Sequence, residues 1–219
     1  MVSNFPQSGP ERHQGQGLFL FDKDTLAARD FWRGALTRDI GSSTVPADRC
    51  NRDASDARTG SSLSSITGAT WSKVKVLTQS KPSLVNLVVL AAVASVLHRI
   101  TGSGVVVLGS PPRGEDLEPN ALPLVMDLSE GQTFRELLVH IKGVAQKAYR
   151  HQQYPHTSIV RDLGLSEEAG RYPLFDVSVR CTGLHGPLPS TTEDIAILMS
   201  PTEEALGLEI TYKPALFDE

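Results

Sequence analysis

Apolar residues fall in separate blocks along the 219-residue chain, and the longest block predicts a core helix. It covers Leu84–Leu97, is interrupted only by Asn86, and follows Pro82, which suits the first turn of a helix. Its 14 residues are fewer than the roughly 20 that cross a bilayer. Because the segment is apolar on nearly every side, we expect it to lie deep in the core and to end at Gly102.

Helical periodicity is clearest in the segment that begins at Thr133. Thr133 and Glu136 have the spacing of a capping box, in which each side chain bonds the backbone N–H of the other residue. Apolar side chains then recur on one face of the predicted helix: Phe134, Leu137, Leu138, Ile141, Ala145, Ala148 and Tyr149. Further helices are predicted over residues 26–36, 69–80 and 157–164.

Short runs rich in β-branched and aromatic residues predict strands over 18–21, 105–109, 121–128, 173–180, 194–200 and 206–214. The run at 105–109 follows a buried helix, so we expect an interior strand in a parallel pairing. Pro123 cannot donate a backbone hydrogen bond, which favours the start of a strand or an edge of the sheet. The order of the elements predicts an α/β fold, a two-layer sandwich with helices packed on a mixed sheet.

Two polar stretches interrupt the predicted domain, which spans residues 18–219. Residues 1–17 are rich in Pro, Gly, Gln and Ser and are interpreted as a disordered arm. Residues 41–68 contain many Ser, Asp, Arg and Gly residues and almost no large apolar side chain, so we expect a flexible crossover. A loop of this length is unusual inside a compact domain. It indicates either that the chain is part of something larger or that the segment is degenerate.

Composition and charge narrow the class of protein. With 40% hydrophobic and 21% charged residues, the chain is typical of a soluble globular protein. Its net charge of −4 does not suit nucleic-acid binding, which needs a basic surface. Cys50 and Cys181 cannot form a disulfide scaffold, and two free thiols in a reducing compartment are expected. No export or membrane segment is recognised, so the cytoplasm is the expected location.

Self-contained catalytic motifs are absent from the sequence. It contains no nucleophile elbow, no phosphate-binding P-loop and no zinc-protease motif. His151 and His156 are separated by a proline and do not share one helix face, so no metal site is predicted. Polar and aromatic residues crowd the segment 148–157, at the end of the periodic helix. This segment is either a cleft wall that contacts a ligand or an exposed helix end with a capped exit.

An ordered series of motifs across residues 24–219 resembles the C-terminal lobe of condensation domains from nonribosomal peptide synthetases. The segment at 151–165, HQQYPHTSIVRDLGL, is closest to the form in starter-type domains of siderophore synthetases. The other matching segments are DFWRGALTRD at 30–39, LAAVASVLHRITGSGVVVLGSPPRG at 90–114, NALPLVMDLSEGQTFRELL at 120–138, GRYPLFDVSV at 170–179 and LEITYKPALFDE at 208–219. No single motif decides the match; their order carries it.

The resemblance implies one lobe of a chloramphenicol-acetyltransferase-like fold, in which two lobes enclose a tunnel. Thioesters held by two carrier proteins enter the tunnel from opposite faces, and an amine attacks the upstream thioester to form an amide. The histidine motif of the family, H-H-x-x-x-D-G, lies in the N-terminal lobe, and no two histidines are adjacent in this sequence. The resemblance therefore assigns no catalytic residue here and implies a fragment that is inactive alone.

Three roles are open to such a chain. It is a fragment of a condensation domain, a non-catalytic module that docks a carrier protein or another synthetase domain, or half of an enzyme completed by a separate N-terminal lobe. The expected partners are peptidyl or aryl carrier proteins and neighbouring synthetase domains, with no nucleic acid and no membrane. No cofactor is expected to bind directly, because the phosphopantetheine arm belongs to the partner carrier protein.

The resemblance also makes a set of residues candidates for the tunnel wall: Arg113, Asn120, His151, Gln152, Gln153, Tyr154, His156 and Arg180. Arg113 is the nearest match to the family arginine that pairs with the aspartate of the histidine motif. Asn120 matches a family asparagine, with an ordinary strand-entry turn as the alternative. His156 replaces the usual phenylalanine or aspartate. Arg180 stands where starter-type relatives carry an amide side chain, and a cation there would alter a site meant for a neutral thioester.

Overall fold

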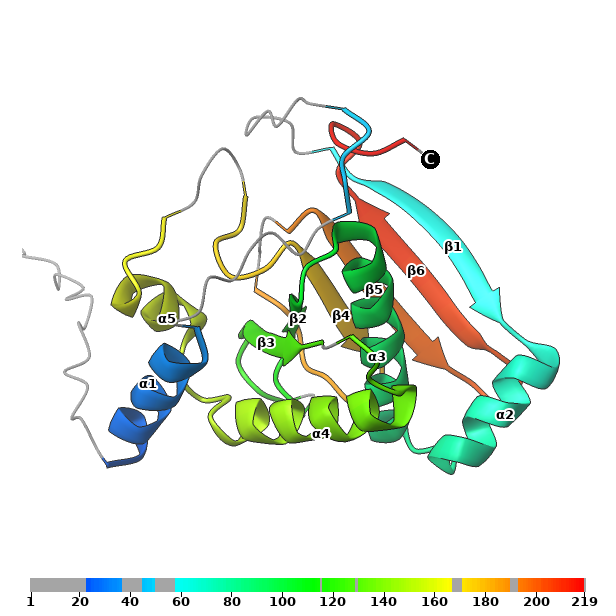
Figure 1. Cartoon of the computed structure of the whole chain (residues 1–219), viewed down its shortest axis with the longest axis horizontal. Helices are drawn as coiled ribbons and strands as arrows, with labels where there is room; N and C mark the ends of the chain where they lie inside the picture. The colour runs from blue at the N-terminus through cyan, green and yellow to red at the C-terminus, as the bar shows by residue number, and fades with distance from the viewer. Residues whose placement is uncertain are drawn as a thin grey trace, which may run out of the picture.

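The computed structural model describes residues 23–36, 45–49, 58–114, 116–128, 130–166, 171–189 and 193–218. The helices within these ranges are α1 (Lys23–Leu36), α2 (Gly68–Thr78), α3 (Pro82–Thr101), α4 (Phe134–Arg150) and α5 (His156–Asp162). The strands are β1 (Gly60–Ile66), β2 (Val105–Ser110), β3 (Leu122–Asp127), β4 (Val177–Cys181), β5 (Ile195–Pro201) and β6 (Leu206–Tyr212). Figure 1 shows the strands as one sheet, with α2 next to the end of the edge strand β1.

The strands form one mixed sheet in the order β1-β6-β5-β4-β2-β3. β2 pairs in parallel with β4, and β4 in parallel with β5, whereas the other neighbouring pairs are antiparallel. The predicted mixed sheet, the parallel pairing of 105–109 and the edge position of Pro123 are confirmed. Because β2 and β4 run in the same direction, the loops that follow them leave the sheet at the same edge.

The helices α3 and α4 cover β2, β3 and β4. α4 packs on β3, α3 packs on β2 and β4, and the two helices contact each other. Leu90 and Ala94 of α3 and Ile141 of α4 are fully buried in the shared core. The hydroxyl of Tyr149, near the end of α4, lies 3.0 Å from the Oγ of Ser110, the last residue of β2. The packing therefore places the end of α4 beside the carboxyl ends of the parallel strands.

Helix α3 begins at Pro82 and ends at Gly102, which adopts a φ of 70°, as predicted. The expectation of deep burial on all sides is wrong, because Val96 and Ile100 are 53% and 46% exposed. Within the described ranges, α3 is the one helix whose length and hydropathy would suit a membrane span. Its inner face packs against β2 and β4, as the core helix of a globular domain does.

The capping box of α4 is confirmed. Thr133 Oγ1 accepts the N–H of Glu136 at 3.3 Å, and Glu136 Oε2 accepts the N–H of Thr133 at 2.8 Å. Leu137 and Ala148 are buried as expected, but Phe134 is 46% exposed. Side chains tilt toward the N-terminus of a helix. Phe134 is the first residue of α4, so its side chain extends beyond the end of the helix and is not covered by the packing that buries the rest of this face.

Strand β1 departs from the sequence prediction, which places a flexible crossover at 41–68. It pairs antiparallel with β6 along its whole length, from Gly60 opposite Tyr212 to Ile66 opposite Leu206. Most of its side chains are exposed, so the pairing depends on backbone hydrogen bonds rather than on an apolar pattern. The expectation of a mobile crossover is therefore wrong for these residues.

Another part of the expected crossover, residues 45–49, contacts the C-terminal segment. The backbone N–H of Arg49 donates to the carbonyl of Leu216 at 3.1 Å, and the Arg49 side chain forms an ion pair with Asp218. The expected arm at 1–17, the expected strand at 18–21 and Cys50 lie outside the described residues.

Strand β4 begins at Val177 rather than at residue 173. The turn before it is held by an ion pair in which the Arg171 guanidinium donates to the Asp176 carboxylate at 2.5 and 2.6 Å. Asp176 is buried, and an ionised carboxylate is tolerated inside a protein only when it is paired in this way. The predicted strand is therefore shortened by a turn.

Candidate functional site

Three segments meet at the carboxyl ends of β2 and β4. They are the loop after β2, the loop after β4 and the turn after α4. The N–H of Gly114 donates to the carbonyl of Leu184 at 3.0 Å, and the N–H of Gly186 donates to the carbonyl of Pro112 at 3.2 Å. Ligands of open α/β sheets bind outside the carboxyl ends of the strands, so this edge is the candidate site.

Gln152 joins the turn after α4 to the loop after β2. Its Oε1 accepts the N–H of Arg113 at 2.8 Å, and its Nε2 donates to the carbonyl of Arg113 at 3.3 Å. The structure thus brings these two predicted residues together. These two hydrogen bonds fix the backbone of Arg113, and its exposed guanidinium takes no part in them.

Asn120 is buried, and the backbone around the turn uses its whole side-chain amide. Nδ2 donates to the carbonyls of Gln152 and Tyr154 at 2.8 and 2.9 Å. Oδ1 accepts the N–H groups of Ala121 and His156 at 3.0 and 2.8 Å. An amide has two N–H donors and two lone pairs. Asn120 therefore holds the turn in shape and keeps no free polar group for a ligand.

His156 is fixed against the same amide. Its Nδ1 lies 3.1 Å from Asn120 Oδ1, the oxygen that already accepts two backbone N–H groups. Burial lowers the pKa of His156 below its ordinary value of 6.5, so the ring is neutral near pH 7. A neutral imidazole has one nitrogen with a lone pair, so the His156 ring can accept a hydrogen bond.

His151 and Tyr154 attach neighbouring helices to the turn. Trp32 Nε1 of α1 donates to the carbonyl of His151 at 3.2 Å, and the hydroxyl of Tyr154 donates to the carboxylate of Asp162 in α5. Burial, followed by the hydrogen bond and charge of Asp162, raises the pKa of Tyr154 to about 12. Gln153 is exposed. Most of the polar groups predicted in this turn thus serve its structure.

A buried chain of polar side chains that the sequence reasoning missed lies beside the turn. The Tyr149 hydroxyl is 2.9 Å from Nε2 of His185 and 3.0 Å from the Oγ of Ser110. The backbone N–H of Cys181 donates to Nδ1 of His185 at 3.0 Å, so Nε2 carries the hydrogen and donates to Tyr149. No spacing in the sequence links these residues, because they come from β2, α4, and β4 with its following loop.

Arg180 is connected to the site through His185. Burial, followed by the positive charges of Arg180 and Arg113, lowers the pKa of His185 to about 4. The His185 ring is therefore neutral near pH 7. The Nε of Arg180 is buried and has no hydrogen-bond partner.

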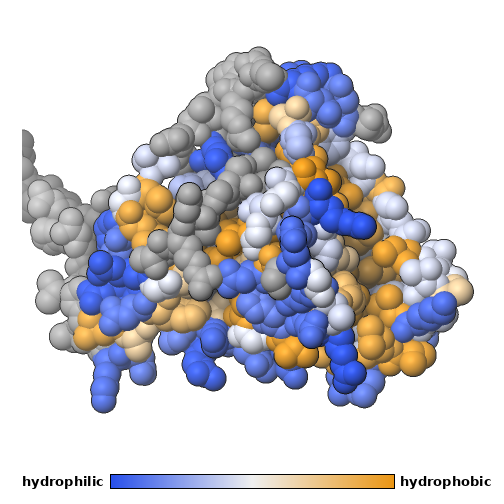
Figure 2. All heavy atoms as spheres, in the orientation of Figure 1, coloured by the Kyte–Doolittle hydropathy of each residue, from blue (hydrophilic) through white to orange (hydrophobic). Residues whose placement is uncertain are grey.

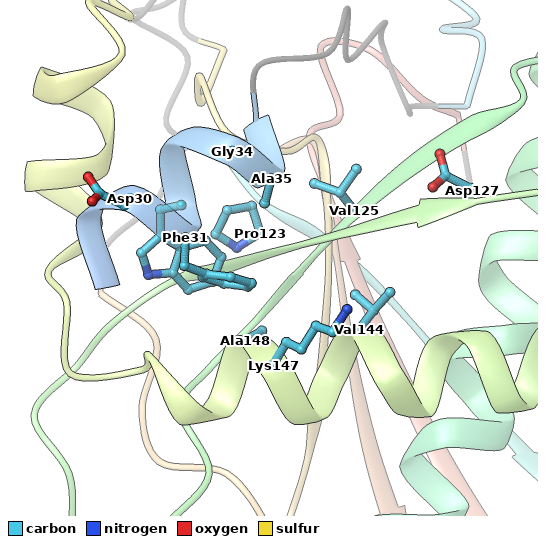
Figure 3. A pocket seen from close by; sticks show the side chains of 11 residues that line it. Asp30, Phe31, Gly34, Ala35, Pro123, Val125, Asp127, Val144, Lys147 and Ala148 are labelled. Carbon is cyan, nitrogen blue, oxygen red and sulfur yellow. The ribbon is translucent and has the colours of Figure 1, made fainter. Parts of the chain in front are cut away.

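A separate pocket of about 380 Å³ lies between α1, β3 and α4 (Figure 3). Phe31, Pro123 and Val125 contribute apolar surface, and Asp30 and Lys147 contribute charge. None of the predicted tunnel-wall residues lines it. Within the described ranges, no group of three or more His, Cys, Asp or Glu side chains lies close enough to hold a metal ion.

Comparison with protein sequences gives one consistent result. A family model described as the condensation domain matches residues 14–219. A plipastatin synthase protein of Bacillus subtilis (strain 168) is 26% identical over 216 residues. The match covers 86% of this chain but 6% of that synthase, so the chain corresponds to a small part of its relative.

Two solved structures share the fold. The X-domain in its complex with OxyB from teicoplanin biosynthesis has a TM-score of 0.75 and 22% identity, covering 90% of this chain and 49% of that chain. A mutant of the starter condensation domain of rhizomide synthetase, in complex with C8-CoA, has a TM-score of 0.71 and 20% identity. This match also covers 90% of this chain and 49% of the solved chain. The chain therefore spans about half of each solved chain.

Proposed function

Because the chain belongs to the condensation-domain family over residues 14–219, we propose that it is the C-terminal lobe of such a domain. The complete domain would join aminoacyl or peptidyl groups, held as thioesters on carrier proteins, through an amide bond. The observation that carries the proposal is the share of a solved condensation domain that the chain covers. The chain spans 49% of the solved starter condensation domain, and the residues that the structure describes form one mixed sheet with its helices.

These 219 residues do not form amide bonds by themselves in this proposal. No two histidines are adjacent in them, so the H-H-x-x-x-D-G motif that the family uses to position the amine is not among them. The polar groups at the candidate site are engaged: Asn120 and Gln152 bind backbone, and Tyr154 binds Asp162. A histidine of an N-terminal lobe would supply the missing base.

Substrates would reach the lobe on the phosphopantetheine arms of carrier proteins, and the lobe itself would bind no cofactor. The carboxyl edge of β2 and β4 is where a thioester would lie, because the loops and the turn converge there. The neutral ring of His156 would accept a hydrogen bond from an incoming amine or amide.

The decisive experiment supplies the purified chain with an aminoacyl donor carrier protein and an aminoacyl acceptor carrier protein and detects amide product by mass spectrometry. A complete two-lobe condensation domain from a relative is the positive control, and circular dichroism verifies that the chain is folded. We expect product from the complete domain and none above background from the chain. Product from the chain alone, at a rate close to that of the complete domain, would overturn the proposal.

Co-expression tests whether a separate N-terminal lobe completes the enzyme. An N-terminal lobe that carries the histidine motif is produced together with this chain, and a tag on one lobe is used for purification. A split enzyme predicts a stable complex that forms amide product. If the two lobes purify apart, this form of the proposal is wrong.

A second function, docking of a synthetase protein without catalysis, is favoured by exposed apolar surface on α2. Val76 and Leu77 are 82% and 61% exposed, and Figure 2 shows apolar residues gathered over α2 at the lower right. The similar X-domain was solved in complex with OxyB. Calorimetric titration with a carrier protein should give saturable binding that the double variant Val76→Ser, Leu77→Ser weakens. No binding by the unaltered chain would contradict docking.

A further inference from the structure

Within the part of the chain that the structure describes, β3 is an edge strand, and its outward main-chain groups can be identified. The N–H of Leu128 donates to the carbonyl just before β2 at 2.8 Å and so points toward that strand. The N–H of Asp127 points the other way and donates to Nε2 of His140 at 3.1 Å. Main-chain groups alternate in direction along an antiparallel strand. Those of Val125 and Pro123 therefore also face away from β2.

Val125 lies in the middle of this open edge. Pro123, at one end, has no N–H, and the N–H of Asp127, at the other end, is taken by His140. The outward N–H and carbonyl of Val125 have no partner within the described ranges. An unpaired strand edge is a template on which another extended chain can form hydrogen bonds. The open edge has room for a strand of about three residues.

The pocket of about 380 Å³ lies along this edge. Its β3 wall consists of Pro123, Val125 and Asp127, which are the residues whose main-chain groups face outward. In Figure 3, α1 lies above β3 and α4 lies below it, on either side of the pocket. Ligand sites typically measure about 300–1,000 Å³, so the pocket suits a short peptide rather than a larger ligand.

The two helices give the pocket different walls. Phe31 and Ala35 of α1 contribute apolar surface, whereas Lys147 of α4 contributes a positive charge. The carboxylates of Asp30 and Asp127 lie at opposite ends of the pocket in Figure 3, with the Lys147 ammonium between them. Asp30 forms an ion pair with the preceding arginine at 3.4 Å. Lys147 has no ion pair within the described ranges, so the middle of the pocket suits a carboxylate.

We propose that the pocket binds an extended peptide segment of a partner protein, which adds to β3 as a further strand and places an acidic side chain against Lys147. The main-chain groups of the peptide bond those of Val125, and the side chains fit the two helical walls. Successive side chains of a strand point to opposite sides, so an acidic residue facing α4 lies between two residues facing α1. The favoured order is apolar, acidic, apolar. This binding goes beyond the proposed function and is tested without amide formation.

NMR titration of the whole ¹⁵N-labelled chain with the peptide acetyl-Val-Glu-Val-amide measures the binding. We expect a saturable shift of the Val125 amide signal and slower hydrogen exchange of that amide, because a strand added to β3 occupies its N–H. The same peptide with an N-methyl group on each valine and on the glutamate has no main-chain donor in these residues. It should bind at least about tenfold more weakly.

Gly34→Leu tests whether the peptide occupies the pocket. Gly34 lines the pocket, and a β-carbon there meets nothing within 4 Å, so a leucine can enter the space without disturbing α1. This variant should bind the peptide at least about tenfold more weakly. Gly143→Leu is the matched control, because Gly143 is a helical glycine with the same free space and does not line the pocket. It should bind normally.

Charge is tested with acetyl-Val-Gln-Val-amide, which differs from the first peptide by the carboxylate. The unaltered chain should bind the glutamate peptide about threefold more tightly, as expected for an exposed ion pair. Lys147→Gln should lose this preference. Lys142→Gln, an exposed position of α4 outside the pocket, should keep it.

Three results would overturn the proposal. The first is a Val125 amide that does not respond saturably to the glutamate peptide. The second is equal affinity for the N-methylated and unmodified peptides, or equal binding by Gly34→Leu and Gly143→Leu. The third is equal affinity of the unaltered chain for the glutamate and glutamine peptides. The amide NMR spectrum of each variant verifies its folding.

Discussion

The ring of Phe175 lies against the backbone of Gly109, so close that a β-carbon at Gly109 would come within 2.3 Å of a ring carbon. Gly109 belongs to β2, and Phe175 lies in the turn before β4. The two strands pair in parallel through Leu108 opposite Val177 and Gly109 opposite Ser178. The absence of a side chain at Gly109 therefore lets the turn close over the strand that leads into the candidate site.

Gly109→Ala should destabilise the protein by about 2 kcal/mol, because the buried ring has little room to move away. Urea unfolding followed by circular dichroism measures the change. Gly143→Ala in α4 is the matched control, since a β-carbon there meets nothing within 4 Å. It should stabilise the helix by about 0.5–1 kcal/mol. An unchanged unfolding midpoint for Gly109→Ala would contradict the close contact.

Asn120→Ala should destabilise the protein by about 3 kcal/mol, because it leaves carbonyl and N–H groups of the turn without partners. The amides around residues 152–156 should also exchange their hydrogens faster than in the unaltered protein. Urea unfolding and hydrogen exchange measure the two effects. Gln153→Ala removes an exposed side chain of the same turn and should change stability by less than about 0.5 kcal/mol. Similar effects of the two substitutions would show that Asn120 does not hold the turn.

His185 should make the protein lose stability as the pH falls. Its pKa is lowered from 6.5 to about 4 in the folded protein, so the unfolded chain binds more protons between these values. The stabilisation is complete above pH 6.5 and is lost as the pH falls toward 4. Linkage gives about 3 kcal/mol over this range.

The measurement compares the free energy of unfolding at pH 7.5 and pH 4 for the unaltered chain and His185→Gln. Other groups also titrate in this range, and the difference between the two proteins isolates His185. The unaltered chain should lose more stability than the variant. An equally steep loss in His185→Gln would show that the ring is not held in its neutral form.

Cys181 should resist thiol reagents while the protein is folded. The residue is fully buried in β4, and burial raises the pKa of its thiol to about 11. Because the thiolate is the reactive form, alkylation by iodoacetamide at pH 8 should be about a hundredfold slower than in urea. A Cys50→Ser variant leaves Cys181 as the one thiol of the chain. Rapid labelling of the folded variant, read by mass spectrometry, would contradict the burial.

Local signals account for most of the secondary structure that the sequence predicts correctly. The capping box of Thr133 and Glu136 lies within one helical turn, and Gly102 ends α3 through its own φ. Strand β1 has no such signal, because its serines neither alternate with apolar residues nor become buried. Its pairing partner is β6, far along the chain, so the strand exists through a long-range contact that no local pattern encodes.

At the candidate site, too, the sequence predicts some features and misses others. The resemblance names Arg113, Asn120 and Gln152 in one set of candidates, and the structure joins them by hydrogen bonds. Asn120 binds backbone groups of the turn rather than a ligand. The sequence does not show this, because the carbonyls that it binds, those of Gln152 and Tyr154, lie in another segment of the chain. His185 escapes prediction because its surroundings, including Tyr149, are assembled from separate elements.

The pairing of β1 with β6 also has a consequence for the order in which the protein can fold during synthesis. Ile66 is made 140 residues before its partner, Leu206. At roughly 5–20 residues per second, the ribosome takes about 7–28 s to cover that distance. Throughout this delay β1 must wait as an unpaired strand. A segment that is mostly serine can stay exposed to water without associating with other nascent chains. A strand of valines or isoleucines in its place would promote such association.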